Sequence, residues 1–296
     1  MAAIGYFPGC SLHGSALEFD HSVRAVAREL GEELREVPDW ICCGSSSAHV
    51  LDSDAALVLP AYTLAKAFRA GLREVLAPCA MCFQRLRSTA HKLAANPALA
   101  EEVARALGAE NAQELAQVRT LSILEWLERM PPERVRNRIK QPLKGLKVAC
   151  YYGCLLVRPP KITGVEEPEA PRSMEKLVSL LGATPVRWGL ATECCGASFS
   201  LSRKPTVLRQ SRRIYELAHE AGADVLCLAC PMCHSNLDMR QDEFLGAEQA
   251  RLPALYIAQL VGLAFDLGPP ELGLDHHFVP AAPALEAAAA RETNRG

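Results

Sequence analysis

The feature that most constrains this chain is a pattern of five cysteines that occurs twice. Each copy has a lone cysteine, then two adjacent cysteines followed by glycine, and then a Cys-x-Met-Cys motif. In the first copy 31 and 35 residues separate these parts, and in the second 39 and 34. The copies are Cys10, Cys42, Cys43, Cys79 and Cys82, and Cys154, Cys194, Cys195, Cys230 and Cys233. A match of this kind indicates a duplicated structural unit.

The length of the chain agrees with a duplication. Its 296 residues are enough for two domains that each bury a core. We expect a first domain at residues 1–140, with a helical extension and a linker, and a second at 141–296. Ala, Glu and Arg dominate the residues after about Ala281, which predicts a frayed C-terminal tail.

Short apolar runs alternate with helical periodicity in both halves. The predicted strands are 2–7, 34–37 and 74–77, then 146–152, 184–188 and 224–228. The predicted helices are 15–30, 54–70 and a wholly helical 91–127, then 174–181, 206–221 and 253–265. This alternation predicts an α/β fold of two tandem, pseudo-symmetric domains. Each has a small, mostly parallel sheet flanked by helices, with the cysteines in loops at the strand ends.

Composition excludes several classes of protein. The net charge is −2, with 22 % charged and 49 % apolar residues, which favours neither disorder nor a nucleic-acid partner. We expect no signal peptide and no membrane span, since the longest apolar run, 255–265, is too short. The chain is therefore expected in the cytoplasm, where clustered thiols more often hold metal than form disulfides.

Five thiols in each copy favour an iron–sulfur centre over zinc. Zinc and a cubane cluster each take four protein ligands, so one thiol would be left over. The side chains of adjacent cysteines point in different directions, so the two thiolates more naturally ligate different metal ions of one cluster. The glycine after each pair, Gly44 or Gly196, permits a positive φ and lets backbone N–H groups approach sulfur. Zinc in one of the two copies remains the alternative.

The other candidate residues are interpreted as structural. Cys150 and Cys227 fall at strand positions without a thiol in the first half and are expected to be buried core. His13, His49 and the pair His276-His277 are expected to be surface residues or hydrogen-bonded structure.

The motifs Gly-Cys, Cys-Cys-Gly and Cys-x-Met-Cys each occur twice, and together they resemble the CCG cysteine-rich domains of the B-type subunit (HdrB) family of heterodisulfide reductases. The stretches 151–159 and 229–237 resemble that family closely. The resemblance implies that each set of five cysteines ligates one noncubane [4Fe-4S] cluster. It also implies an oxidoreductase acting on sulfur groups, in which two facing clusters reduce or reversibly form a disulfide. Leu155 follows Cys154 where methanogen members often have His, which leaves the substrate open.

The resemblance also implies a multi-subunit complex. The chain has no ferredoxin-type motif, flavin fingerprint or glycine-rich dinucleotide loop. The expected partners are a ferredoxin-like subunit of the C type and a flavin and iron–sulfur subunit of the A type, with a small thiol or disulfide as substrate. These partners would provide any membrane association. The alternative is an electron-relay or membrane-associating iron–sulfur subunit of a succinate dehydrogenase-type complex.

Overall fold

The chain forms two four-stranded sheets of the same topology. The computed structural model describes residues 3–45, 48–109 and 112–293. The strand order is β2-β1-β3-β4 in one sheet and β6-β5-β7-β8 in the other, and every pair of neighbouring strands is parallel. The predicted α/β class with parallel sheets is confirmed.

The first half places helices between its strands. Its strands are β1 (Ile4–Tyr6), β2 (Leu34–Glu36), β3 (Glu74–Leu76) and β4 (Arg119–Leu121). Its helices are α1 (Gly9–Leu12), α2 (Leu17–Glu29), α3 (Ala48–Leu51), α4 (Ala55–Arg69), α5 (Ala80–Ala95), α6 (Pro97–Ala106), α7 (Gln113–Ala116) and α8 (Ile123–Glu128). Ala2, the first residue of the predicted strand 2–7, lies outside the described residues.

The second half repeats the plan after α9 (Pro132–Arg136). Its strands are β5 (Lys147–Cys150), β6 (Thr184–Pro185), β7 (Val225–Leu228) and β8 (Ala254–Tyr256). Its α-helices are α10 (Pro160–Thr163), α11 (Ser173–Leu180), α12 (Lys204–Glu220), α13 (Pro231–Leu237), α14 (Gln241–Phe244), α15 (Ile257–Ala264), α16 (Pro269–Leu272) and α17 (Ala282–Thr293). Two 3₁₀ turns, η1 (Ala197–Phe199) and η2 (Leu274–His276), complete it.

The fourth strand of each sheet was missed by the sequence prediction. The segment 91–127 is not wholly helical, because Asn96 caps a new helix at Pro97 and β4 lies at Arg119–Leu121. Likewise β8 occupies the start of the helix predicted at 253–265. Each strand has three residues and runs directly into the next helix. Such a short strand shows no alternation of its own, so its apolar residues merge with those of the helix.

Residues 282–293 form a helix, where the sequence predicted a frayed tail. Ala288 of α17 is buried, and Arg291 of the same helix contacts the Gly145 carbonyl and Asp224. Alanine has the highest helix propensity, so this composition extends a helix as readily as it marks a loose tail. The basic stretch after Pro132 is also docked, since Arg134 pairs with Glu32 at 2.8 Å.

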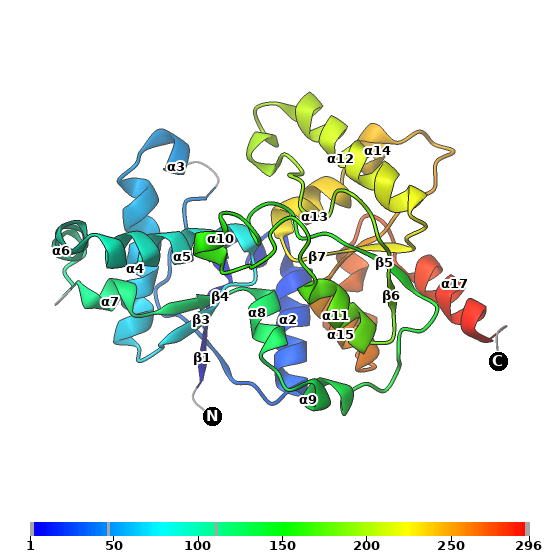
Figure 1. Ribbon diagram of the computed structural model, residues 1–296, viewed down its shortest axis with the longest axis horizontal. Coiled ribbons are helices and arrows are strands. Elements are labelled where there is room, and N and C mark those ends of the chain that lie inside the picture. The colour runs from blue at the N-terminus through cyan, green and yellow to red at the C-terminus, as the bar shows by residue number, and fades with distance from the viewer. Residues whose placement is uncertain (1–2, 46–47, 110–111, 294–296) are drawn as a thin grey trace.

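The two halves pack reciprocally along a shared seam. Figure 1 shows α2 of the first half beside α15 of the second at the centre of the molecule, and these helices are in contact. Helix α11 of the second half packs in turn on α8 of the first, and α10 packs on α5. One hydrophobic core runs through both sheets and the seam. Each half therefore buries helices that belong to the other.

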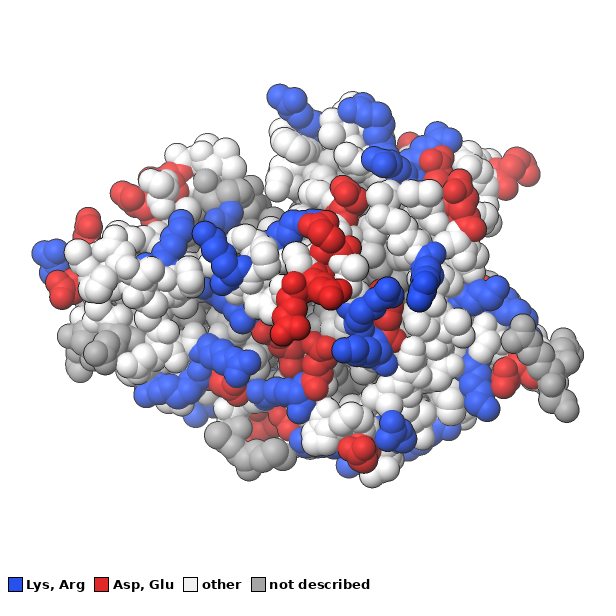
Figure 2. Space-filling model, in the orientation of Figure 1, with Lys and Arg blue, Asp and Glu red and all other residues white. Residues whose placement is uncertain are grey.

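The surface mixes both signs of charge. On the face shown in Figure 2, acidic and basic side chains lie interleaved, in keeping with the near-neutral net charge. Among the described helices, none is long and apolar enough to cross a bilayer.

Candidate functional site

The first five cysteines gather at the carboxyl edge of their sheet. Cys10 lies in α1, just after β1, and Cys42 and Cys43 lie in the loop that follows β2. Cys79 caps the N-terminus of α5, and Cys82 is in its first turn. Sγ of Cys10 lies 3.6 Å from Sγ of Cys42, and Sγ of Cys43 lies 3.3 Å from Sγ of Cys82. Four of these thiols thus form two close pairs, with Cys79 beside Cys82.

The second five cysteines repeat this arrangement. Cys154 follows β5, Cys194 and Cys195 precede η1, and Cys230 caps α13, which carries Cys233. Sγ of Cys195 lies 3.5 Å from Sγ of Cys233, and Cys154 hydrogen-bonds to Cys194. The structure therefore brings together each quintet that the sequence predicts.

Glycines let the backbone pass close to the sulfurs. Gly9 and Gly153, which precede the lone cysteines, both have φ of +65°. A Cβ at Gly9 would lie 3.0 Å from Sγ of Cys82, and one at Gly153 would lie 3.4 Å from Sγ of Cys233. Gly44 and Gly196 also have positive φ, as expected, and the N–H of Gly196 donates to Sγ of Cys194 at 3.3 Å.

The first thiol of each Cys-Cys pair holds negative charge by accepting hydrogen bonds. Hydrogen bonds with Cys10 and Cys43 lower the pKa of Cys42 to about 2. The hydrogen bond with Cys154 lowers the pKa of Cys194 to about 6, helped by the backbone N–H groups of Gly196 and Ala197. Thiolates packed at this spacing are the ligands that soft metal centres take.

The two quintets meet at the seam. Cys79 and Cys230, one from each half, are close enough to hydrogen-bond, and this bond raises the pKa of Cys79. A cavity of about 40 Å³ lies among the second quintet, and Ala80 and Met81 of the first half line part of it. The wall around the second set of thiols is thus completed by the motif of the first.

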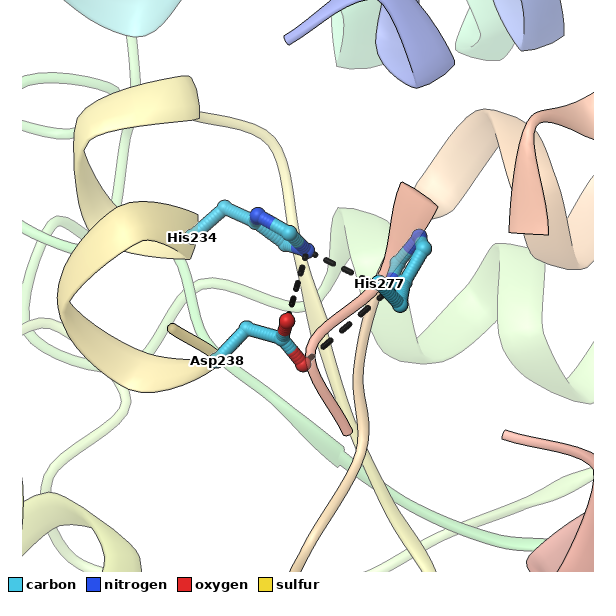
Figure 3. A group of neighbouring side chains, drawn as sticks. All are labelled: His234, Asp238 and His277. Carbon is cyan, nitrogen blue, oxygen red and sulfur yellow. Dashed lines mark hydrogen bonds and ion pairs between the residues drawn. The ribbon is translucent and has the colours of Figure 1, made fainter. Parts of the chain in front are cut away.

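A second buried cluster at the seam was missed by the sequence analysis. His234 projects from α13 and Asp238 caps the C-terminus of that helix, and His277 faces them from the segment that follows η2 (Figure 3). Nε2 of His234 lies 3.3 Å from Nδ1 of His277. Oδ2 of Asp238 lies 4.0 Å from Nε2 of His234, and its Oδ1 lies 4.0 Å from Nδ1 of His277. The detectable signal was the four-residue spacing of His234 and Asp238, which places both on one face of a helix.

The cluster is a hydrogen-bonded network and not a metal site. Its three groups lie within 4.8 Å, a spacing that a metal could bridge. However, the amide of Gln259 is oriented by accepting from the Tyr256 N–H at 2.9 Å and donating to the Leu272 carbonyl at 3.0 Å. Its Nε2 therefore donates to Nε2 of His277 at 2.8 Å. The proton of the neutral His277 ring is then on Nδ1, the nitrogen that faces His234.

Burial keeps both imidazoles of the network neutral. It lowers the pKa of His234 to about 3 and that of His277 to about 4, and it raises the pKa of Asp238 to about 6. His234 also stacks on Tyr256 at 4.6 Å between ring centroids, and Tyr256 stacks on Phe19 of the first half at 4.0 Å. The network thus ties the second Cys-x-Met-Cys helix to the first half.

The remaining candidates are structural, as expected where they can be assessed. Cys150 and Cys227 are fully buried neighbours on β5 and β7. His277 is hydrogen-bonded structure and not surface, whereas the side chain of His49 lies outside the described residues.

The comparisons with known proteins match the doubled geometry. The model of the CCG family, described as a cysteine-rich domain, matches residues 4–87 and 148–238. The chain belongs to the CCG cysteine-rich domain family. It has two CCG domains, one for each quintet.

Two relatives that match this CCG protein over nearly their whole length are named as subunits of different kinds of reductase. The membrane anchor subunit of the 8-methylmenaquinol:fumarate reductase of Wolinella succinogenes is 34 % identical, over 93 % of this chain and 96 % of the relative. The B-type subunit of the ferredoxin/F420H2-dependent CoB-CoM heterodisulfide reductase of Methanosarcina acetivorans is 29 % identical, over 94 % of each.

A solved structure shares the fold of the two CCG domains. It is that of a hypothetical protein from Helicobacter pylori, with a TM-score of 0.70 at 14 % identity. The match covers 93 % of this chain and about half, 51 %, of that protein.

Proposed function

We propose that this protein is the iron–sulfur subunit of a heterodisulfide reductase-like complex, in which each quintet of cysteines ligates one noncubane [4Fe-4S] cluster. The ligands would be Cys10, Cys42, Cys43, Cys79 and Cys82, and Cys154, Cys194, Cys195, Cys230 and Cys233. The observation that carries the proposal is the meeting of the two quintets, since Ala80 and Met81 of the first half line the cavity of the second quintet and Cys79 interacts with Cys230. Bound clusters would supply one-electron transfer and iron sites for sulfur.

The residues fit such a group better than they fit zinc. Each quintet offers five thiols at one sheet edge, one more than a tetrahedral zinc site takes. The positive-φ glycines leave room for sulfur beside the backbone, as the 3.0 Å approach at Gly9 illustrates. Backbone N–H groups such as that of Gly196 already point at a ligand sulfur.

The chain's own residues would leave the thiols open to a substrate on one side and shield them from water on the other. Cys10 and Cys194 are exposed, whereas Cys79, Cys82, Cys230 and Cys233 are buried. Met81 covers the second quintet with an apolar side chain, which lowers the local dielectric. A small disulfide would therefore approach from the exposed cysteines toward the buried seam.

The first test is the metal content of the protein purified without oxygen. Two clusters require about eight irons and about eight acid-labile sulfides per chain. About four irons with one zinc would support the alternative in which one CCG domain holds zinc. A chain without iron would overturn the proposal.

A second candidate function is electron relay in a quinol:fumarate reductase-type complex. The relative of Wolinella succinogenes, named as a membrane anchor subunit, is the observation that favours it. Reduced protein should be reoxidised by a small disulfide if it acts on sulfur. Reoxidation only through a flavoprotein partner and fumarate, with no response to disulfides, would favour relay. In both cases electrons would come through partner subunits, such as a ferredoxin-like and a flavin subunit.

A further inference from the structure

The two Cys-x-Met-Cys helices differ at one position that faces the thiols. Three residues after the last cysteine of the motif, the first half has Arg85 on α5 and the second has Asn236 on α13. Both lie one helical turn beyond a ligand cysteine, so both can reach the second member of the Cys-Cys pair. A matched pair of positions with unlike charge is a direct way to make two duplicated centres unequal.

In the second half, Asn236 is a fixed neutral donor. It is fully buried, and its Nδ2 lies 3.4 Å from both Sγ and the carbonyl oxygen of Cys195. Its Oδ1 accepts from the hydroxyl of Ser200 at 3.1 Å, which fixes the amide orientation. An N–H aimed at a ligand sulfur is a known means of adjusting an iron–sulfur centre.

In the first half, Arg85 brings a positive charge to the matching position, one helical turn beyond Cys82, whose Sγ lies 3.3 Å from that of Cys43. Its guanidinium interacts electrostatically with the Cys43 thiol, the counterpart of Cys195. Its Nε is buried and has no hydrogen-bond partner. Among the described residues, no carboxylate forms an ion pair with it, in contrast to Arg87, which pairs with Glu125 at 2.5 Å. The charge of Arg85 is thus left for whatever the first quintet binds.

We propose that Arg85 and Asn236 tune the two metal centres to different reduction potentials, so that the centre of the first half is the easier to reduce. The inference rests on the proposed function, because it requires a centre in each half. Reduction adds a negative charge, which an unpaired guanidinium stabilises more than an amide N–H does. The half-buried position of Arg85 keeps solvent from screening this effect fully.

The test is a potentiometric titration of the iron-loaded protein, followed by electron paramagnetic resonance. Arg85→Gln should lower one midpoint potential, with at least a tenfold change in the one-electron equilibrium constant, which corresponds to about 59 mV. The one-electron equilibrium constant of the other centre should change by less than threefold. Asn236→Leu should lower the potential of that other centre by a smaller amount. Arg85→Lys keeps the positive charge, so the equilibrium constant of the first centre should stay within threefold of the wild-type value.

Arg87→Gln is the matched control. It removes the same charge from the same helix, but two residues along an α-helix correspond to a rotation of about 200°. Arg87 therefore points away from the face of Arg85 and toward Glu125, and both one-electron equilibrium constants should change by less than threefold. The tuning is overturned if Arg85→Gln moves neither potential, moves both equally, or acts no more strongly than Arg87→Gln. Iron and sulfide content separates the two claims. About eight irons with unmoved potentials overturns the tuning alone, whereas a wild-type chain without iron overturns the proposed function as well.

Discussion

Three positions after the Cys-x-Met-Cys motif carry different chemistry in the two halves. One, three and five residues after the last cysteine, they are Phe83, Arg85 and Arg87 in the first half and His234, Asn236 and Asp238 in the second. Strand order, thiol pairing and positive-φ glycines are the same in both. The duplicated backbone thus preserves the geometry of the thiols, while the residues beyond them differ in charge.

The partners of these residues differ in the same way. In the first half Arg87 forms an ion pair with Glu125 at the start of α8. In the second, the matching position at the start of α15 is Gln259, which joins the neutral network of His277. The first half therefore places the cation of Arg85 near its thiols, and the second places the neutral amide of Asn236 there. Such differences separate the properties of two similar centres without moving a ligand.

The largest expected effect comes from removing one ligand from one half. Cys43→Ala should lower the iron content from about eight to about four per chain, and Cys195→Ala should do the same for the other centre. The double variant should bind no iron. Metal analysis with electron paramagnetic resonance checks this, and a complete loss of iron in either single variant would contradict independent loading of the halves.

The glycines before the lone cysteines should respond unequally. Gly9→Ala and Gly153→Ala both force a side chain into positive φ, which costs about 1–2 kcal/mol. Gly9→Ala also brings its Cβ to 3.0 Å from Sγ of Cys82, against 3.4 Å at Gly153. We expect the larger loss of thermal stability and of iron from Gly9→Ala. Equal losses would show that the sulfur contact has no influence.

The polar network of the second half should make stability depend on pH. The folded-state pKa of Asp238 is about 6, above the ordinary carboxyl value of 3.8, so its stabilising contribution is greatest at low pH and is lost as pH rises through about 6. The difference in unfolding free energy, Asp238→Asn minus wild type, should therefore increase by about 1–2 kcal/mol between pH 5 and pH 8. Thermal unfolding across this range measures it. A difference that stays constant across this pH range would contradict the assignment to Asp238.

The smallest effect is expected at α17, which has no counterpart in the first half. Arg291 pairs with Asp224, but its side chain is partly exposed, so Arg291→Ala should cost below about 1 kcal/mol. Iron content should not change. A loss of the second centre in this variant would mean that α17 supports the thiols as well as the edge of the domain.

The residues that form the candidate site were predictable from sequence, whereas their surroundings were not. The first three strands of each half each lead into a cysteine-bearing loop, and each was predicted within a few residues. The cysteine pattern itself identified both quintets, because the doubled spacing has no other ready explanation.

What the sequence did not reveal depends on contacts between distant segments. Strands β4 and β8 are recognisable as strands only by pairing with β3 and β7. His277 contacts His234 although 43 positions separate them in the sequence, and no local sequence pattern predicts that contact. Arg85 resembles its neighbour Arg87 in the sequence, and only the position of Glu125 distinguishes the paired charge from the unpaired one.

The reciprocal packing of helices across the seam has a consequence for synthesis in the cell. A growing chain completes its first half while α15, which covers α2, has not yet been made. Until then, Cys79 lacks its neighbour Cys230, and the surface that the second half will bury is open to water. If the proposed clusters bind, a closed and protected state of either centre would require β8 and α15, so it would form only after translation of residue 264.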